Sequence, residues 1–249
     1  MDLTNKVALV TGGTRGIGAA AAMQFARRGA DVALVGRTVD DEVRALVGEI
    51  EATGRQCLLL SEDVGDSKAA ARCVAATVDA LGGLDVLVHS AGGPHNGRME
   101  DIDAEVWYRA FDVHVHAAFH LCRAAIPHLR QAGEGAIVLV SSVAGIRGCD
   151  GIFSYGVVKG AVLQFTRMLG RELADDNIRV NCVAPGIIRT RFHDGMSPEK
   201  AQYNMDHRIP LHREGKPADV GAAIVTLAEN DYITGECLVV DGGLTSRIA

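Results

Sequence analysis

The sequence predicts an α/β protein of a single domain, in which helices cover both faces of a doubly wound, seven-stranded parallel sheet. Short runs of aliphatic and β-branched residues alternate with longer segments of helical character along the chain. These short runs are continuously apolar, as expected of parallel strands that are buried on both faces. The length of 249 residues suffices for one substantial core.

Each strand and helix of this prediction has its own segment. The predicted strands span residues 6–10, 31–35, 56–60, 84–89, 135–141, 178–183 and 236–240. The predicted helices span residues 17–29, 40–53, 67–81, 102–131, 155–174 and 218–228. The least periodic stretch, residues 189–216, follows the carboxyl end of the sixth strand. Ligands of open α/β sheets bind at that edge, so we expect this stretch to form a mobile substrate lid on the single domain 1–249.

Composition and charge exclude several classes of function. The net charge of −6 leaves no basic footprint for nucleic acid, and no apolar run approaches the ~20 residues that a membrane span needs. The first residues lack the apolar core of a signal peptide, so we expect the native start of a cytoplasmic protein. The six cysteines form no CxxC pair, and we interpret them as mostly buried thiols in a reducing compartment.

A glycine-rich segment, "VTGGTRGIG" at residues 10–18, follows the first predicted strand and opens the first helix. Gly12, Gly16 and Gly18 allow a tight turn and let a pyrophosphate approach the helix N-terminus, where free N–H groups and the helix dipole favour an anion. The spacing differs from the G-x-G-x-x-G fingerprint, and glycines also build ordinary strand–helix turns. The position after the first strand nevertheless favours a dinucleotide site on a Rossmann fold.

The end of the second strand discriminates between NAD and NADP. An NAD enzyme is expected to carry an acidic residue there, roughly 20 residues beyond the glycines, to bind the ribose 2′-hydroxyl. This chain has Gly36, Arg37 and Thr38 instead. The Arg37 guanidinium suits a 2′-phosphate, and Arg15 of the glycine loop adds a second positive charge. The sequence therefore predicts NADP(H), the alternative being that Arg37 is only a solvated residue at a helix start.

Tyr155 and Lys159 stand four residues apart, so they share one face of the predicted helix. A tyrosine with an ordinary pKa of about 10 exchanges its proton poorly at neutral pH. An ammonium ~4 Å away stabilises the phenolate by up to ~4 kcal/mol at an effective dielectric of ~20, before desolvation opposes it. The pair is thus a candidate general acid/base, and Ser142 at the end of the neighbouring strand is a candidate to hold a substrate oxygen. Alone, the spacing also fits an exposed helical pair.

Together these features resemble one family, the short-chain dehydrogenases/reductases, in the branch whose chains have about the length of this one. The resemblance covers almost the whole chain and includes the interval between Ser142 and Tyr155. It rests on "TGGTRGIG" (11–18), "DV" (63–64), "SAGG" (90–93), "SSVAG" (141–145), "YGVVK" (155–159), "RVNCVAPGIIRT" (179–190) and "VVDGG" (239–243). The joint occurrence of these motifs is highly specific.

The resemblance implies a role for each matched residue. Ser142 polarises the carbonyl or alcohol oxygen, Tyr155 transfers its proton, and Lys159 lowers the pKa of Tyr155 while it binds the nicotinamide ribose. Asp63 with Val64 would flank the adenine, and Ile188 with Thr190 the nicotinamide carboxamide. The implied cofactor-binding residues are Gly12, Thr14, Arg15, Gly16, Ile17, Gly18, Arg37, Thr38, Asp63, Val64, Ser90, Ala91, Gly92, Tyr155, Lys159, Pro185, Gly186, Ile188 and Thr190. A helix cap at Asp63 and a turn residue at Thr190 are the simpler alternatives.

The chain departs from the pattern of this family at His114. The family usually carries an asparagine there, which holds a water that links the lysine to solvent. An imidazole donates, accepts and titrates near neutrality, so His114 is a candidate to serve in this relay itself, and satisfying the backbone of a kinked helix is the alternative. Ser90 stands where asparagine is frequent, which we expect to affect packing only.

His116 and His120 are a second pair of residues four apart, one turn after Asp112, a spacing that also suits a metal. The predicted hydride chemistry requires no metal, and this helix is expected to face the sheet and a neighbouring subunit. We therefore predict no metal site and interpret both histidines as surface or interface residues.

The sequence thus predicts an NADP(H)-dependent oxidoreductase that interconverts a ketone and a secondary alcohol. A 3-oxoacyl thioester is the first candidate substrate, because relatives of this pattern are often 3-oxoacyl-carrier-protein reductases and Arg98, Arg147, Arg189 and Arg191 could meet an acidic carrier. A sugar or polyol, or a cyclic steroid-like ketone, is the alternative. The substrate pocket is expected to be lined by residues 92–99, 144–153 and the lid.

An alternative of another class is a regulatory protein that binds NADP and has lost turnover. The complete set of Ser142, Tyr155 and Lys159 argues against it, because a sensor has little use for an acid/base pair. The resemblance also implies a homotetramer, which would pack the long helices 102–131 and 155–174 and the C-terminal strand. No nucleic-acid or membrane partner is expected.

Overall fold

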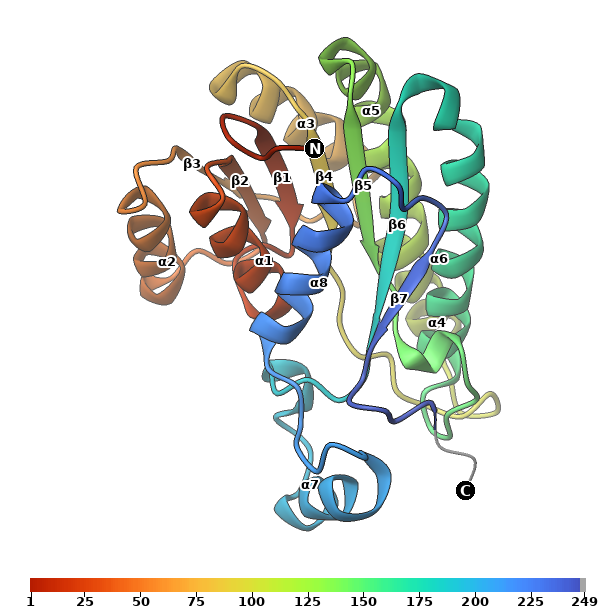
Figure 1. Cartoon of the computed structure of the whole chain (residues 1–249). Coiled ribbons are helices and arrows are strands. Elements are labelled where there is room, and N and C mark those ends of the chain that lie inside the picture. The colour runs from red at the N-terminus through yellow and green to blue at the C-terminus, as the bar shows by residue number, and fades with distance from the viewer. Residues whose placement is uncertain (247–249) are drawn as a thin grey trace.

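Seven strands form one parallel sheet in the order β3-β2-β1-β4-β5-β6-β7 in the computed structural model, which describes residues 1–246 (Figure 1). The strands are β1 (Val7–Thr11), β2 (Asp31–Gly36), β3 (Cys57–Ser61), β4 (Val86–His89), β5 (Gly135–Val140), β6 (Ile178–Pro185) and β7 (Cys237–Val240). Each pair of neighbours is parallel. The predicted fold class is confirmed.

The helices form a layer on each face of the sheet. They are α1 (Gly16–Arg27), α2 (Asp41–Glu51), α3 (Ser67–Leu81), α4 (Ala104–Phe111), α5 (Ala117–Ala132), α6 (Phe153–Glu172), α7 (Pro198–Tyr203) and α8 (Pro217–Glu229). One core lies under α1, α2 and α8, and the other lies under α3, α5 and α6. Alternate residues of each strand enter opposite cores, so that Val10 packs in the first and Leu9 in the second. This arrangement explains why the strands read as continuous apolar runs.

The helix predicted over residues 102–131 is the main difference from the sequence-based expectation. The chain forms α4 and α5 there, joined by a π-helical turn at Asp112–His116. Such a turn inserts one extra residue into a helix and is frequent at functional sites. The turn buries the side chain of His114, at 1% exposure.

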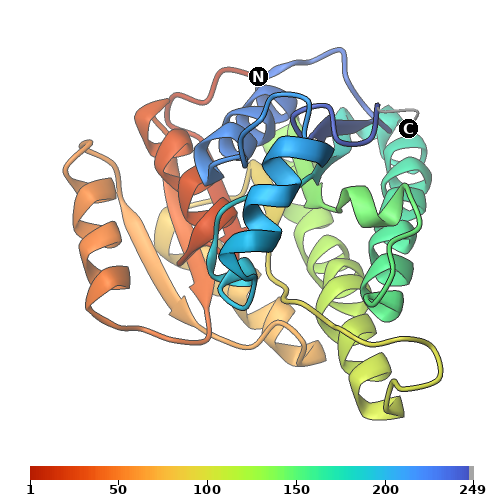
Figure 2. The same cartoon turned by 90° about the horizontal axis from the view of Figure 1, so that it is seen from below.

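The carboxyl ends of all seven strands meet at one edge of the sheet. In Figure 1 this edge faces downward, and α7 lies below it; Figure 2 looks onto the edge, with α7 in front of the sheet. The chain runs outward from β1 through β2 to β3, and then returns to β4 on the other side of β1. Ligands bind where the strand order reverses in this way, so the loops after β1 and β4 are the expected binding edge.

Among residues 1–246, no helix has both the length and the apolar character required to cross a bilayer. Cys73, Cys122 and Cys182 are buried thiols, whereas Cys149 is exposed.

Candidate active site

The loop after β1 brings the chain close to the loop after β4. Gly12 and Gly16 have φ angles of +64° and +56°, which side chains rarely adopt. A Cβ on Gly12 would lie 2.7 Å from the backbone nitrogen of Ala91, so no other residue fits this approach. No side chain caps the N-terminus of α1. Its first N–H groups therefore remain available to an anion.

A cavity of about 800 Å³ runs from this loop to Tyr155. The predicted residues on its wall are Gly12, Thr14, Arg15, Gly16, Ile17, Arg37, Thr38, Asp63, Val64, Ser90, Ala91, Gly92, His114, Tyr155, Lys159 and Thr190. These residues come mainly from loops after five different strands, from the π-helical turn and from α6. The cavity is long enough to offer separate surfaces to the two ends of an extended ligand.

Five predicted residues lie behind the wall rather than on it: Gly18, Ser142, Pro185, Gly186 and Ile188. Gly18 packs against the carbonyl of Gly12, where a Cβ would lie only 2.2 Å from the oxygen. Gly186 packs in the same way against Asp241, and Ile188 is buried. Gly18, Gly186 and Ile188 thus pack just behind the wall, and their part in binding a cofactor stays a prediction.

The arginines near the end of β2 differ in whether their charge is already paired within the chain. Arg15 forms ion pairs with Asp40 and Glu42, and Glu42 also pairs with Arg191 at 2.5 Å. Arg37 is exposed and makes no ion pair within residues 1–246. Arg37 is therefore the side chain at this end whose charge remains free for an anionic ligand.

Asp63 is fixed by a partner that the sequence did not reveal. Its Oδ2 accepts a hydrogen bond from Arg109 Nη2 at 2.6 Å, and its Oδ1 accepts one from the Gly65 backbone at 2.9 Å. Burial opposes the charge on Asp63, but these bonds outweigh it and hold its pKa below the usual value. The cap of α3 is Asp66, whose side chain accepts from Lys68 N, so the helix-cap alternative for Asp63 is wrong.

Ser142, Tyr155 and Lys159 converge beside β5. Ser142 lies just beyond the end of β5, where its Oγ accepts a hydrogen bond from Ala144 N at 3.2 Å, and Tyr155 lies in the first turn of α6. Lys159 lies one turn further along α6, with Nζ 5.5 Å from the centre of the Tyr155 ring. Its ammonium donates to the carbonyl oxygen of Val140 at 2.7 Å. The Ser141 hydroxyl donates to the Lys159 carbonyl at 2.7 Å, which ties α6 to the end of the strand.

The protonation of this group differs from the sequence-based expectation. Burial raises the pKa of Tyr155 to about 12, and the hydrogen bond with Ser142 opposes this only in part. Burial also lowers the pKa of Lys159 to about 7. The expected lowering of the Tyr155 pKa by Lys159 is thus not found, because desolvation disfavours the charged form of both groups. Tyr155 is a neutral phenol over the whole neutral range.

His114 lies on the cavity wall next to Tyr155, with ring centroids 5.7 Å apart and planes at 84°. Its Nε2 is 3.3 Å from the carbonyl oxygen of Gly93. Burial and then the nearby charge of Lys159 hold the pKa of His114 well below its usual value. This corrects the expectation that His114 titrates near neutrality, because a buried imidazole beside a cation stays neutral.

Three further aromatic side chains lie near Tyr155; the sequence indicated His95 as part of the pocket but did not single out Phe192 or His89. Phe192 packs on the Tyr155 ring with centroids 5.4 Å apart, and His95 packs on His114 at 5.4 Å. His89, beneath them at the end of β4, bonds Thr11 Oγ1 at 2.8 Å and the Val113 carbonyl oxygen at 3.1 Å. Phe192 and His95 belong to segments that were expected to line the pocket, but neither has a periodic pattern that would mark it.

The predicted lid, residues 189–216, contains more regular structure than its sequence suggests. It includes a 3₁₀ turn at Arg191–His193, helix α7 and a π-helical turn at Asn204–Arg208. Its first residues, 189–192, lie on the cavity wall. Through them this segment meets the cavity at the same end as Tyr155.

The four arginines considered for an acidic carrier mostly have partners already. Arg98 pairs with Asp150 at 2.9 Å, and Arg189 pairs with Glu214 at 2.5 Å. Arg191 shares Glu42 with Arg15, and Arg147 donates to the Thr245 carbonyl oxygen at 3.4 Å. Their charges are therefore largely compensated within the chain.

The second pair of histidines lies on the surface. His116 Nδ1 is 3.0 Å from Asp112 Oδ1, and the His120 ring packs on Phe119 with centroids 5.2 Å apart. Within residues 1–246, no cluster of three or more acidic, histidine or cysteine side chains is arranged to hold a metal ion.

Comparisons with known proteins agree with this geometry. A family model described as enoyl-(acyl carrier protein) reductase matches residues 12–245. The chain is 39% identical to dehydrogenase/reductase SDR family member 4 of Oryctolagus cuniculus, over 99% of this chain and 96% of that protein. The crystal structure of a putative short-chain alcohol dehydrogenase from Sinorhizobium meliloti 1021 superposes with a TM-score of 0.94, at 38% identity and over 99% of both chains.

A second solved structure bears on the cavity. It is L-sorbose reductase from Gluconobacter frateurii complexed with NADPH and L-sorbose, which superposes with a TM-score of 0.92 at 30% identity. The match covers the whole of both chains, at 100% each.

Proposed function

The chain belongs to the short-chain dehydrogenases/reductases, a family of oxidoreductases, and we propose that it interconverts a ketone and a secondary alcohol with NADP(H) as the hydride carrier. The observation that carries the proposal is the convergence of Ser142, Tyr155 and Lys159 at one end of a cavity whose other end is the glycine loop. The sequence motifs that resemble this family are thereby joined to a single site.

The residues around the cavity suit NADP(H). The close approach of Gly12 to Ala91 leaves no space for a side chain in the glycine loop, and the uncapped start of α1 suits the pyrophosphate. Arg37 suits the 2′-phosphate, because its charge has no acidic partner within residues 1–246. The NADPH in the L-sorbose reductase structure supports the same cofactor here. When bound, NADPH supplies the hydride that the reduction requires.

The acid/base residues favour the reductive direction. Reduction requires a proton on the carbonyl oxygen as the hydride reaches the carbonyl carbon. Tyr155 holds that proton throughout the neutral range, since its pKa is raised to about 12. The Ser142 hydroxyl, which acts on the same Tyr155 phenol, stabilises the developing alkoxide. Lys159, held by the Val140 carbonyl, places its Nζ beside Tyr155, and in its protonated form it would attract the negative charge that proton transfer leaves on the phenol oxygen.

Two substrate classes remain as proposals within this reaction. The description of the family model supports an acyl thioester carried by an acidic protein. The L-sorbose bound in the neighbouring structure supports a sugar or polyol. The second class fits the charges better, because Arg98, Arg189 and Arg191 are already paired with carboxylates. We propose in addition that residues 189–216 act as a lid, and that the protein is a cytoplasmic homotetramer.

The test compares NADPH with NADH in the reduction of a panel of oxoacyl thioesters, keto sugars and cyclic ketones. We expect turnover with NADPH and a preference for it over NADH, which Arg37→Ala reduces by about tenfold or more. Arg44→Ala is the matched control, because Arg44 is an exposed arginine of α2 whose partner is Asp41. A wild type that prefers NADH would refute the cofactor assignment.

A regulatory protein without turnover is the alternative of another class. It predicts tight binding of NADPH, no oxidation of NADPH with any ketone, and no change in binding when Tyr155 is replaced by Phe. The same panel therefore distinguishes the two functions.

A further inference from the structure

Two histidine rings lie in contact with one another and with Tyr155 at the reactive end of the cavity. His114 packs against both His95 and Tyr155, with ring centroids 5.4 and 5.7 Å away and planes at 83° and 84°. Both histidines lie on the cavity wall. The acid/base chemistry proposed above assigns no part to either ring.

The hydrogen bonds of His114 define its tautomer. Its Nε2 lies 3.3 Å from the carbonyl oxygen of Gly93, which can only accept, so Nε2 carries the proton. In a neutral ring the other nitrogen, Nδ1, then keeps its lone pair and is an acceptor. This Nδ1 is buried and has no partner in the described part of the chain. His114 therefore presents one unused acceptor beside Tyr155.

His95 leaves a second ring nitrogen unused. Its Nε2 is also buried and has no partner within residues 1–246. Only two other buried side-chain atoms of these residues lack a hydrogen bond, Glu214 Oε1 and Arg15 Nε, and Arg15 Nε lies 3.5 Å from Glu42 Oε2 in an ion pair. Buried polar atoms are normally satisfied, so their concentration here indicates a role in binding.

His89 shows that this fold is able to satisfy a buried imidazole completely. It lies beneath the same cavity, and both of its ring nitrogens have partners, Thr11 Oγ1 and the Val113 carbonyl oxygen. The unused nitrogens of His95 and His114 are thus a local property of the reactive end rather than a general consequence of burying histidine.

The surrounding charges restrict what these nitrogens can bind. Burial and the positive charge of Lys159 keep His114 neutral, and burial, Arg109 and Lys159 act in the same way on His95. A cationic group is disfavoured because these neighbours are positive. A carboxylate has no proton to give to His114 Nδ1. A hydroxyl, in contrast, donates to His114 Nδ1 and can accept from His95 Nε2 in its N–H form.

We propose that His95 and His114 form a subsite for a hydroxyl group on the carbon next to the substrate carbonyl, so that the protein reduces α-hydroxyketones to vicinal diols. The inference rests on the proposed function, because the hydroxyl is placed relative to a carbonyl oxygen that Tyr155 protonates. Because the His114 ring contacts the Tyr155 ring, a hydroxyl bound at His114 lies close to the carbonyl oxygen that Tyr155 protonates. This places the hydroxyl on the carbon next to the carbonyl. The hydride and the Tyr155 proton add across the carbonyl, and the neighbouring hydroxyl is unchanged.

Access to the subsite requires a small movement of one loop. Both unused nitrogens lie beneath the cavity surface. His95 belongs to segment 92–97, which has no helix or strand and contains Gly92, Gly93 and Gly97. A Cβ on Gly92 would lie 2.1 Å from His114 Cε1, so this glycine is needed for the ring to occupy its place. Displacement of His95 by this loop admits the hydroxyl to His114 Nδ1.

The experiment compares three small ketones that differ at the position next to the carbonyl. Hydroxyacetone donates and accepts a hydrogen bond there, methoxyacetone only accepts, and butanone does neither. We expect kcat/KM of the wild type with NADPH to be about tenfold or more higher for hydroxyacetone than for butanone. Methoxyacetone is expected to behave like butanone, because it has no proton to give to His114.

Two variants and one control assign the effect to the subsite. His114→Phe and His95→Phe keep an aromatic ring but remove the nitrogens, and each is expected to bring the hydroxyacetone-to-butanone ratio close to one. His116→Phe is the matched control, since His116 is exposed and pairs with Asp112; it is expected to keep the ratio of the wild type. Equal rates for the three ketones in the wild type, or the same loss in all three variants, would overturn the subsite.

A spectroscopic measurement separates failure of the subsite from failure of the proposed function. If none of the three ketones is reduced, the proposed function fails with them. The subsite is then tested by ¹⁵N resonances of His114 in protein saturated with NADP⁺. We expect a neutral ring protonated at Nε2 at pH 7, and a shift of Nδ1 on addition of hydroxyacetone but not of butanone. Identical spectra with the two ketones would contradict the proposal independently of turnover.

Discussion

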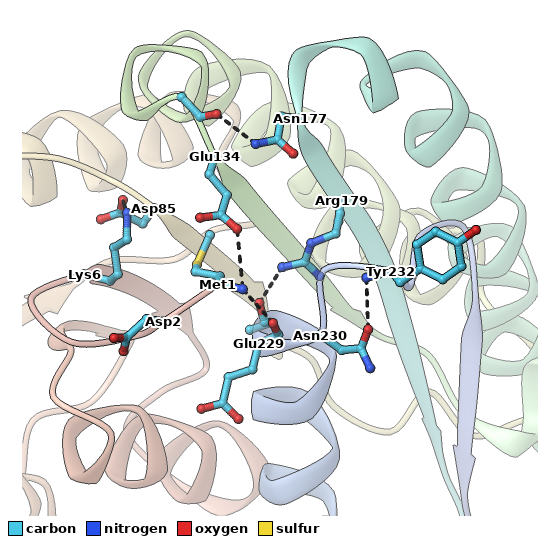
Figure 3. A network of polar contacts seen from close by, with 12 residues as sticks. Met1, Asp2, Lys6, Asp85, Glu134, Asn177, Arg179, Glu229, Asn230 and Tyr232 are labelled. Carbon is cyan, nitrogen blue, oxygen red and sulfur yellow. Dashed lines mark hydrogen bonds and ion pairs between the residues drawn. The ribbon is translucent and has the colours of Figure 1, made fainter.

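The two edges of the sheet, at the amino and the carboxyl ends of its strands, differ in whether their polar side chains have partners within the chain. At the amino ends of the strands, the charged residues are matched by partners within the chain (Figure 3). Lys6 pairs with Asp85 at 3.0 Å. The N-terminal ammonium of Met1 donates a hydrogen bond to the Glu229 carbonyl oxygen at 2.7 Å, and the Arg179 guanidinium donates one to the Leu227 carbonyl oxygen at 2.6 Å. In the described part of the chain, no buried side-chain atom at this end lacks a partner.

At the carboxyl ends, some buried polar atoms have no hydrogen-bond partner and the charged form of Lys159 is disfavoured. His95 and His114 each keep one buried nitrogen without a hydrogen-bond partner in the described residues, and the pKa of Lys159 is lowered to about 7 by burial. Unsatisfied or desolvated groups cost stability, so they persist where binding or catalysis needs them. The comparison indicates that one end of the sheet maintains the fold and the other performs the chemistry. Substitutions at the two ends should therefore have different consequences.

The largest expected effect is on activity, from Lys159→Met at the carboxyl end. We expect kcat/KM with NADPH to fall about 100-fold or more, because the ammonium beside Tyr155 is lost. The thermal midpoint should not decrease, since an apolar side chain replaces a buried amine whose charge is disfavoured. Steady-state kinetics and calorimetry measure the two properties, with Lys68→Met on α3 as the control. Full activity of Lys159→Met, or loss of its fold, would contradict the proposal that the carboxyl end serves the chemistry and the amino end the stability.

The next effect is on stability, from Arg179→Met at the amino end. Arg179 is buried and donates to the carbonyl oxygens of Leu227 and Ala228, near the end of α8. Its replacement leaves these acceptors without their donor, so we expect about 2–3 kcal/mol less free energy of unfolding. Denaturant unfolding measures this loss, and kcat/KM should stay within about twofold of the wild type. Arg171→Met, at an exposed position of α6, is expected to change neither; a large loss of activity in Arg179→Met at unchanged stability would contradict the comparison.

The smallest effect for a single step of one pH unit, at most about 1.4 kcal/mol, is a pH dependence of stability that originates at Lys159. Its pKa is about 7 in the folded protein and 10.5 for the free side chain. Between these values the unfolded chain binds more protons, so the free energy of unfolding gains a contribution as pH rises from about 7 to about 10.5. This contribution is lost again as pH falls through that window. Unfolding of the wild type and of Lys159→Met at several pH values measures it as a difference, and a difference that is independent of pH would contradict a Lys159 pKa that burial lowers.

The features of the fold that depend on local sequence were predictable. The seven strands agree with their predicted segments closely, because parallel strands buried on both faces are continuously apolar. The glycine loop was predictable for a similar reason, since the approach of Gly12 to Ala91 leaves no space for a side chain. Ser142, Tyr155 and Lys159 were brought together by the end of one strand and one face of the following helix.

The features that depend on long-range contacts were not predictable. The π-helical turn at Asp112–His116 adds a residue without disturbing the apolar pattern of residues 102–131, so the sequence showed one helix. The bond between Arg109 and Asp63 joins residues that are far apart in the chain and leaves no local signal. The directions of the pKa shifts at Tyr155 and Lys159 depend on burial, which the four-residue spacing does not reveal.

The central claim is that the carboxyl end of the sheet binds NADPH and that the Tyr155 hydroxyl gives its proton to the substrate. The most direct test measures NADPH binding and ketone reduction in the wild type and in Tyr155→Phe. We expect the variant to bind NADPH with nearly the affinity of the wild type and to lose at least about 100-fold in kcat for every ketone that the wild type reduces. Reduction at the rate of the wild type by a correctly folded Tyr155→Phe would contradict the claim.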